Sequence, residues 1–195
     1  MKIRSAARRL PPKSCDSNMP ALFLDRDGVI NERLPGDYVK TPEAFKPAPG
    51  FPEAIRLLSK VFDPVIVVTN QQGIGKGLMD EHQLAEVHDY MLGIVERAGG
   101  RVNAIYYCPH LKTGNCTCRK PATGMAWMAL QDFPDINPED TWMAGDSHSD
   151  MEFADRMGFR KVFIRGNDEA DPKASTVKPD FIFDSLYDFA RFITS

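Results

Sequence analysis

The sequence predicts an α/β fold: a three-layer α/β/α sandwich around a mostly parallel, Rossmann-like sheet. Short apolar runs typical of buried strands alternate with segments of helical periodicity along the chain. Two of these runs, residues 21–24 and 65–68, meet polar residues only at their carboxyl ends. Regular alternation of strand and helix implies right-handed βαβ crossovers, which produce a parallel sheet between two helical layers.

The expected elements follow one another in a regular order. Strands are expected near residues 21–25, 64–69, 102–107, 140–144, 161–164 and 180–183, and helices near residues 51–60, 80–98, 123–131, 148–157 and 185–193. Residues 29–50 are rich in proline and glycine and fit neither period, so we expect a loop or short β-flap there. Residues 108–121 fit neither period either.

The composition is that of one globular domain with an N-terminal extension. The chain has 195 residues, of which 43% are hydrophobic, enough for one doubly wound domain over residues 20–195. Residues 1–19 are basic and lack the apolar segment of a secretory signal, so we expect a disordered extension. The net charge of -3 and the lack of an apolar stretch of ~18 residues argue against nucleic-acid and membrane binding. We expect a cytoplasmic monomer.

The most informative motif is a pair of aspartates at the end of the first strand. Asp25 and Asp27 flank Arg26, and Gly28 follows. A turn here brings both carboxylates out at the carboxyl end of the strand, where ligands bind in open α/β sheets. Taken alone, the motif could be an ordinary Asp-Gly hairpin turn.

Later segments supply partners for a phosphate group. Thr69 and Asn70 end the second strand with neutral hydrogen-bond donors and lead into a glycine-containing loop. Arg119 and Lys120 place two cations before a predicted helix, whose N-terminus also favours an anion. These residue types at the sheet edge favour a phosphate-handling site over an isolated turn.

A second pair of acids follows the fourth strand. Asp146 and Asp150 would join the first pair at the same edge of the sheet. Four crowded carboxylates repel one another unless a hard cation neutralises them. The sequence therefore predicts a magnesium site.

The order of these motifs resembles that of the haloacid dehalogenase (HAD) superfamily of phosphotransferases, over residues 20–190. The resemblance implies that Asp25 is the nucleophile, forming an aspartyl phosphate, and that Asp27 is the general acid and base. It implies Mg²⁺ held by Asp25, the backbone carbonyl of Asp27 and Asp146, with Asp150 as a weaker ligand or a residue that orients Lys120. The phosphate-binding residues that it implies are Gly28, Thr69, Asn70, Arg119 and Lys120.

The second irregular stretch holds three of the four cysteines of the chain. Cys108 and His110 form one close pair, and Cys116 and Cys118 form another. Two such pairs joined by a turn can close a tetrahedral Cys₃His shell around Zn²⁺ with no open position, so we expect a structural zinc. Disulfide formation is the alternative, although it leaves an odd thiol. Cys15 lies in the basic extension and is expected to be a free thiol.

The intervals between motifs are too short for a large cap domain, so the resemblance narrows to capless members that carry such a loop. These are heptose bisphosphate phosphatases and histidinol-phosphate phosphatases. The segments TNQQGIGKG, IYYCPH and RKPATGM resemble the first group, whereas the five residues between His110 and Cys116 resemble the second. A small phosphorylated metabolite is implied, and in a sugar bisphosphate Arg119 would hold the phosphate that is not cleaved. A phosphate-accepting module without turnover and a zinc-binding interaction module are the alternatives from other classes.

The remaining histidines receive no functional role from the sequence. His82 and His88 fall within the predicted helix 80–98 and are expected at the surface. His148 is expected in a solvated loop after the fourth strand.

Overall fold

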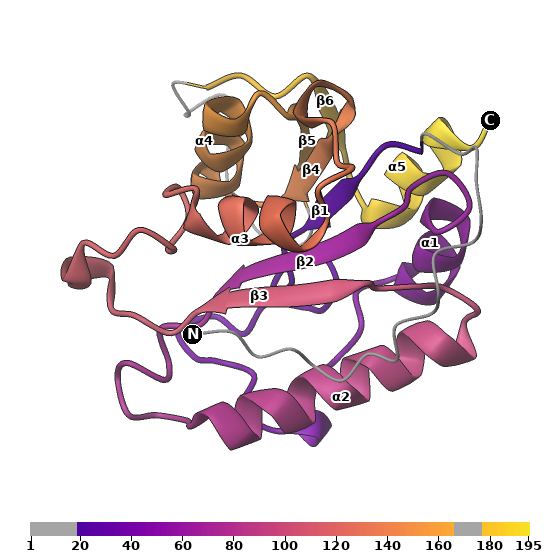
Figure 1. Ribbon diagram of the computed structural model, residues 1–195. Helices are drawn as coiled ribbons and strands as arrows, with labels where there is room; N and C mark the ends of the chain where they lie inside the picture. Colours follow the sequence, from indigo (N-terminus) through magenta and orange to yellow (C-terminus); the bar gives the residue numbers. More distant parts are fainter. Residues whose placement is uncertain (1–18, 166–176) are drawn as a thin grey trace.

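The computed structural model describes residues 19–165 and 177–195, and it confirms the predicted α/β sandwich (Figure 1). Six parallel strands form one sheet in the order β3-β2-β1-β4-β5-β6. The strands are β1 (Leu22–Leu24), β2 (Val65–Asn70), β3 (Ala104–Cys108), β4 (Trp142–Gly145), β5 (Arg160–Ile164) and β6 (Phe181–Phe183). The basic extension and Cys15 lie outside the described residues, apart from Met19.

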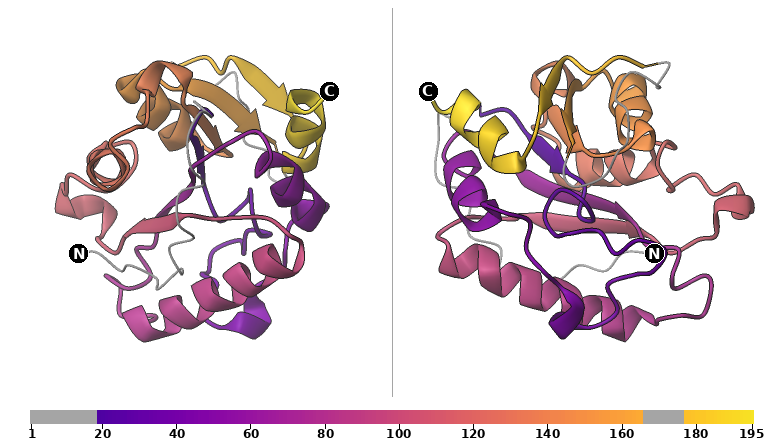
Figure 2. Two further views of the ribbon diagram at one scale, coloured as in Figure 1. Left: turned by 45° about the vertical axis from the view of Figure 1, so that its right-hand side comes forward. Right: turned by 180° about the vertical axis from the view of Figure 1, so that it is seen from behind.

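Helices cover both faces of the sheet (Figures 1 and 2). They are α1 (Phe51–Leu58), α2 (Glu81–Arg97), α3 (Gly124–Asp132), α4 (His148–Met157) and α5 (Leu186–Ile193). Because strand side chains alternate between faces, Leu22 and Leu24 pack with α1, α2 and α5, while Phe23 packs with α3 and α4. No helix among the described residues is both long and apolar enough to cross a membrane.

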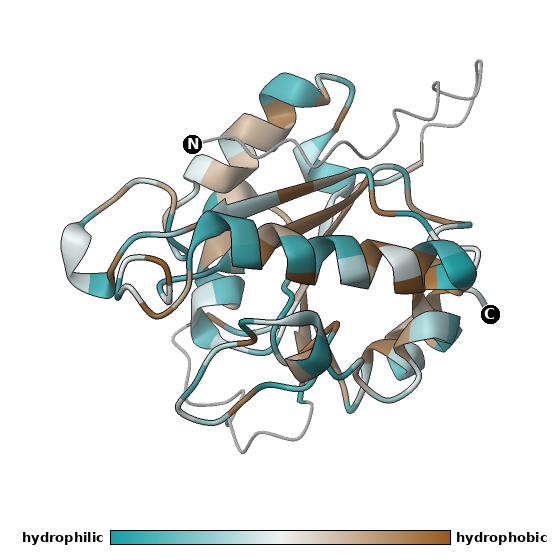
Figure 3. Cartoon of the chain, turned by 90° about the horizontal axis from the view of Figure 1, so that it is seen from below, coloured by the Kyte–Doolittle hydropathy of each residue, from teal (hydrophilic) through white to brown (hydrophobic). Residues whose placement is uncertain are grey.

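Helix α2 shows where one sequence expectation is wrong. It begins with a capping box between Asp80 and Gln83, and in Figure 3 hydrophilic and hydrophobic residues alternate along its length. The side chain of His82 is 81% exposed, as predicted. His88, expected at the surface, is only 4% exposed, because it follows Val87 on the helix stripe that faces the sheet.

The irregular segments lie at the carboxyl edge of the sheet. Residues 29–50 form an ordered loop with a short 3₁₀ helix, η1 (Pro42–Ala44), and isolated bridges from Asn31 to Asp27 and Pro47. No paired strands form a β-flap within this segment. The loop after β3 contains η2 (Lys112–Gly114). At the opposite edge, η3 (Pro138–Asp140) leads into the amino end of β4. Both loops that sequence periodicity left unassigned therefore border the ends of β1, β2 and β3.

Candidate active site

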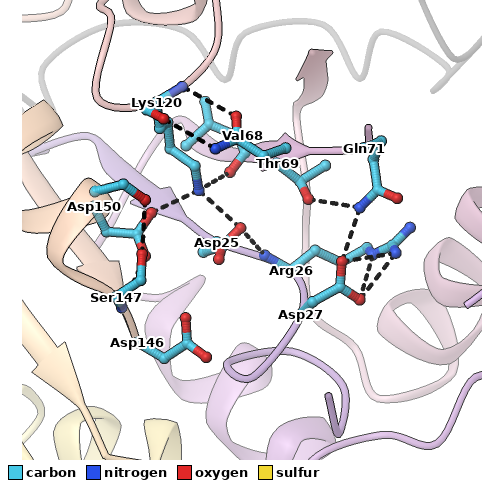
Figure 4. A network of polar contacts seen from close by, with 12 residues as sticks. Asp25, Arg26, Asp27, Val68, Thr69, Gln71, Lys120, Asp146, Ser147 and Asp150 are labelled. Carbon is cyan, nitrogen blue, oxygen red and sulfur yellow. Dashed lines mark hydrogen bonds and ion pairs between the residues drawn. The ribbon is translucent and has the colours of Figure 1, made fainter. Parts of the chain in front are cut away.

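The acid, Thr/Asn and Lys motifs meet at the carboxyl edge of the sheet (Figure 4). Asp25 follows β1, and its backbone N–H donates to the carbonyl of Ala144 in β4 at 2.9 Å. Gly28 has a φ of 96°, and a side chain there would overlap the carboxylate of Asp146. Glycine thus lets the turn after β1 approach the turn after β4 closely.

Three buried carboxylates lie close enough to share one cation. One oxygen from each of Asp25, Asp146 and Asp150 lies within 4.8 Å of the others. Burial raises the pKa of Asp25 to about 6, with Lys120 opposing the shift and Asp150 adding to it. Burial and the charges of Asp25 and Asp150 raise the pKa of Asp146 well above its ordinary value. A hard divalent cation would relieve this repulsion, so the donor set fits Mg²⁺.

Lys120 is the buried cation of this cluster. Its Nζ lies 2.8 Å from Asp25, 2.7 Å from Asp150 and 2.7 Å from the carbonyl oxygen of Val68. Burial alone would lower the pKa of Lys120, but the charges of Asp150 and Asp25 outweigh burial and raise it. Asn70, expected to bind phosphate, holds the backbone of Lys120 on both sides, accepting from its N–H at 3.0 Å and donating to its carbonyl at 3.1 Å. Within the described part of the chain, the second N–H of the Asn70 amide has no acceptor.

Asp150 is engaged on both of its oxygens. One lies against Lys120, and the other accepts from the backbone N–H of Ser147 at 3.1 Å and from the Ser147 hydroxyl at 2.6 Å. The hydrogen bond from the Ser147 backbone is one half of the capping box that begins α4. The arrangement suits a residue that orients Lys120 better than one that ligates a metal directly.

Asp27 lies in contrasting surroundings, although only one residue separates it from Asp25. Arg26 donates to both of its oxygens, at 2.8 to 3.2 Å, and Asn31 donates at 3.0 Å. Gln71 donates to it at 2.8 Å. Burial opposes ionisation, but Arg26 and these hydrogen bonds outweigh it and lower the pKa of Asp27.

Gln71 connects the motif that contains Asp27 with the motif that contains Thr69. Its Nε2 donates to Asp27 at 2.8 Å and to the hydroxyl oxygen of Thr69 at 2.8 Å. Because the Thr69 oxygen accepts this bond, its own hydrogen is left to donate to a phosphate oxygen. Sequence analysis gave no role to Arg26, Asn31 or Gln71, although each lies within four residues of a motif residue.

Two further arginines approach the site. Arg33, which sequence analysis missed, reaches from the loop 29–50 to within 2.8 Å of the Asp146 carboxylate. Arg119 is partly buried, and one of its terminal nitrogens is buried without a hydrogen-bond partner among residues 19–165 and 177–195.

The cysteine-rich loop gathers its four candidate ligands as predicted. The three sulfurs lie 3.3 to 3.6 Å apart, and Nδ1 of His110 lies 3.2 Å from Cys118 and 3.6 Å from Cys108. These sulfurs are too far apart for disulfides, whose S–S bond is ~2.05 Å. The separations are close to those in a tetrahedral shell with Zn–S bonds of about 2.3 Å, so the cluster fits Zn²⁺. Burial opposes ionisation, but hydrogen bonds such as that from the Arg119 backbone lower the pKa of Cys116 to about 7.

Comparison with known proteins agrees with this geometry. Residues 117–189 match the family described as HAD-hydrolase-like. The chain is 39% identical over 174 residues to D-glycero-beta-D-manno-heptose-1,7-bisphosphate 7-phosphatase of Pseudomonas putida, covering 89% of this chain and 98% of the relative. It is 36% identical over 169 residues to the D-glycero-alpha-D-manno-heptose-1,7-bisphosphate 7-phosphatase of Mycobacterium bovis, covering 87% and 88%.

A solved structure gives the same result. The D,D-heptose 1,7-bisphosphate phosphatase of B. bronchiseptica, complexed with magnesium and phosphate, superposes with a TM-score of 0.82 at 31% identity. The superposition covers 90% of this chain and 98% of that one.

Proposed function

The chain belongs to the HAD-like phosphatases, in the family of the D-glycero-D-manno-heptose-1,7-bisphosphate 7-phosphatases, and we propose that it removes the 7-phosphate of this heptose bisphosphate. The observation that carries the proposal is the meeting of Asp25, Lys120, Asp146 and Asp150, from three separate parts of the chain, beside a second acid at Asp27. A module that only accepts phosphate has no use for that second acid, whereas turnover requires it.

The first chemical step transfers the phosphoryl group to the enzyme. An oxygen of Asp25 attacks phosphorus in line, and the bond from phosphorus to the C7 oxygen breaks. Asp27, which gains a proton when the phosphate charge raises its pKa on binding, gives that proton to the departing oxygen, which leaves as the alcohol. Lys120 and the free hydrogen of Thr69 stabilise the charge that spreads over the equatorial phosphoryl oxygens.

The second step hydrolyses the aspartyl phosphate. Asp27, now a carboxylate, takes a proton from water as that water attacks phosphorus, and the bond to Asp25 breaks with release of inorganic phosphate. Asp25, Asp146 and the backbone carbonyl of Asp27 would hold Mg²⁺, which neutralises the carboxylates and polarises the phosphoryl oxygens when bound. Asp150 keeps Lys120 in place.

The proposal also covers the second phosphate and the zinc. Arg119 holds the 1-phosphate, because its planar fork suits a phosphate and it directly precedes Lys120 in the chain. Zn²⁺ bound by Cys108, His110, Cys116 and Cys118 fixes the loop that leads into Arg119 and Lys120. Thiolate ligands persist in a reducing compartment, which supports a cytoplasmic enzyme.

A substrate screen tests the proposal. We expect the highest kcat/KM for one anomer of the heptose 1,7-bisphosphate, with histidinol phosphate and p-nitrophenyl phosphate well below it. Phosphorus NMR of the product should show the 1-phosphate retained. Asp25→Asn, which keeps the shape of the side chain and removes the nucleophile, should abolish turnover with every substrate. A higher kcat/KM for histidinol phosphate would replace the proposed substrate and leave the reaction class intact.

A further inference from the structure

Arg26 is a wholly buried arginine, with no measurable exposure. Arginine is almost never fully buried unless its charge is paired. Its Nε and Nη2 both point at the Asp27 carboxylate, with Nη2 at 2.9 and 2.8 Å from the two oxygens. This planar fork holds both oxygens of Asp27 and so fixes the rotation of the carboxylate.

The other side of Arg26 faces α2. Its Nη1 lies 3.4 Å from Nε2 of His88, and the His88 ring meets Tyr107 edge to face. Arginine can only donate, so Nε2 of His88 accepts, and the ring proton is on Nδ1. Burial and the nearby Arg26 charge lower the pKa of His88 to about 3, so the ring is neutral at physiological pH.

We propose that Arg26, fixed by its contact with the ring of His88, is a positioning residue that aims the Asp27 carboxylate at the leaving-group oxygen. The inference rests on the proposed function, in which Asp27 transfers the proton. Asn31 and Gln71 also hold Asp27, each with one donor, but Arg26 contacts both oxygens at once. If His88 no longer accepts a hydrogen bond from Nη1, the guanidinium of Arg26 loses its fixed orientation. The Asp27 carboxylate that it holds then loses its orientation as well.

Variants of His88 test this positioning role and leave the buried ion pair between Arg26 and Asp27 in place. His88→Met removes the acceptor at similar volume, and His88→Gln places an amide oxygen where Nε2 lies. His82→Met is the matched control, on the same helix but 81% exposed. Thermal unfolding of each variant measures the purely structural part of the effect.

The readout is the dependence of kcat/KM on the leaving group. The C7 alkoxide of the heptose bisphosphate needs a proton to leave, whereas p-nitrophenolate does not. We expect His88→Met to lower kcat/KM about tenfold for the heptose bisphosphate and by less than about twofold for p-nitrophenyl phosphate, as misplacement of a proton donor predicts. His88→Gln should stay within about threefold of the wild type on both substrates, because the acceptor is retained.

Asp27→Asn separates failure of the inference from failure of the proposed function. It should lower kcat/KM at least about a hundredfold for the heptose bisphosphate and far less for p-nitrophenyl phosphate, since only the first needs a general acid. If Asp27→Asn lacks this selectivity, the acid role of Asp27 fails, and the inference fails with it. If Asp27→Asn is selective but His88→Met lowers both substrates equally, or neither, Arg26 and His88 serve the fold alone and the inference is overturned.

Discussion

Mild acid should destabilise the wild-type protein more than a His88→Gln variant. His88 is 4% exposed, and burial together with Arg26 lowers its pKa from 6.5 to about 3. A group whose pKa is lower in the folded than in the unfolded state contributes stability above the unfolded pKa. That contribution is lost as the pH falls, so the loss from His88 begins near pH 6.5 and continues to about pH 3.

The size of this loss of stability follows from the proton on His88, which the unfolded chain binds between pH 7.5 and pH 5 and the folded chain does not. Between pH 7.5 and pH 5, protonation of the unfolded histidine lowers the free energy of unfolding by about 2 kcal/mol. Because the folded pKa lies well below 5, this value depends almost entirely on the unfolded pKa. In a domain of this size it corresponds to a fall of roughly 4 to 8 °C in Tm.

Circular dichroism melts of both proteins at pH 7.5 and pH 5, without magnesium, provide the assay. The quantity compared is the fall in Tm between pH 7.5 and pH 5 in the wild type minus the same fall in His88→Gln. Contributions from groups common to both proteins, such as Asp25, cancel in this difference. Any fixed loss of stability from the substitution cancels as well. His82→Gln should behave as the wild type, since that side chain is 81% exposed. Equal falls in Tm for the wild type and His88→Gln would refute the reasoning.

Four other predictions concern the metal sites and the substrate. Cys116→Ala should lose zinc in metal analysis and should have a lower Tm and a lower kcat/KM than the parent enzyme. Chelation of magnesium should stop the parent enzyme reversibly without removing its zinc. A zinc-free Cys116→Ala variant as active as the parent would contradict this prediction. Arg119→Ala should lower kcat/KM for the bisphosphate by about ten- to a hundredfold, as expected for a lost charged hydrogen bond of about 1.5 to 3 kcal/mol, and leave monophosphates nearly unchanged; equal losses would argue against its grip on the second phosphate. Arg33→Ala should tighten Mg²⁺ binding up to about fivefold in calorimetric titration, because Arg33 pairs with Asp146, and a weaker affinity would exclude that competition. Asp25→Asn should take up protons in weakly buffered solution when the bisphosphate binds, because the phosphate charge raises the pKa of Asp27; no uptake would mean that Asp27 does not gain its proton on binding.

The sequence predicted the fold and the acid, lysine and cysteine residues because local pattern carries that information. Buried parallel strands are continuous apolar runs, and the carboxyl end of such a strand is where a polar motif becomes accessible. Asp25 and Asp146 could therefore be placed at one edge from their positions after two strands. The Cys108–Cys118 spacing likewise predicted a cluster, since short loops limit where their ligands can lie.

The supporting residues could not be predicted, because their roles arise from contacts across the fold. His88 looks like any helix residue until the register of α2 turns it toward Arg26. Asn70 ends a strand as a phosphate donor would, yet its amide is matched to the backbone of Lys120. Arg33 lies in a loop without periodicity, and only the folded path of that loop brings it to Asp146.

Asp25 and Asp27 owe their different roles to what lies on either side of a single turn. Burial, with the charge of Asp150 added to it, raises the pKa of Asp25 to about 6 even with Lys120 beside it. Asp27 faces the buried guanidinium of Arg26 and its pKa falls. Neighbouring acids whose environments drive their pKa values apart usually have different catalytic roles. Without a metal the nucleophile is the harder of the two to ionise, so the magnesium dependence we expect follows from the same crowding that positions Asp25 for attack.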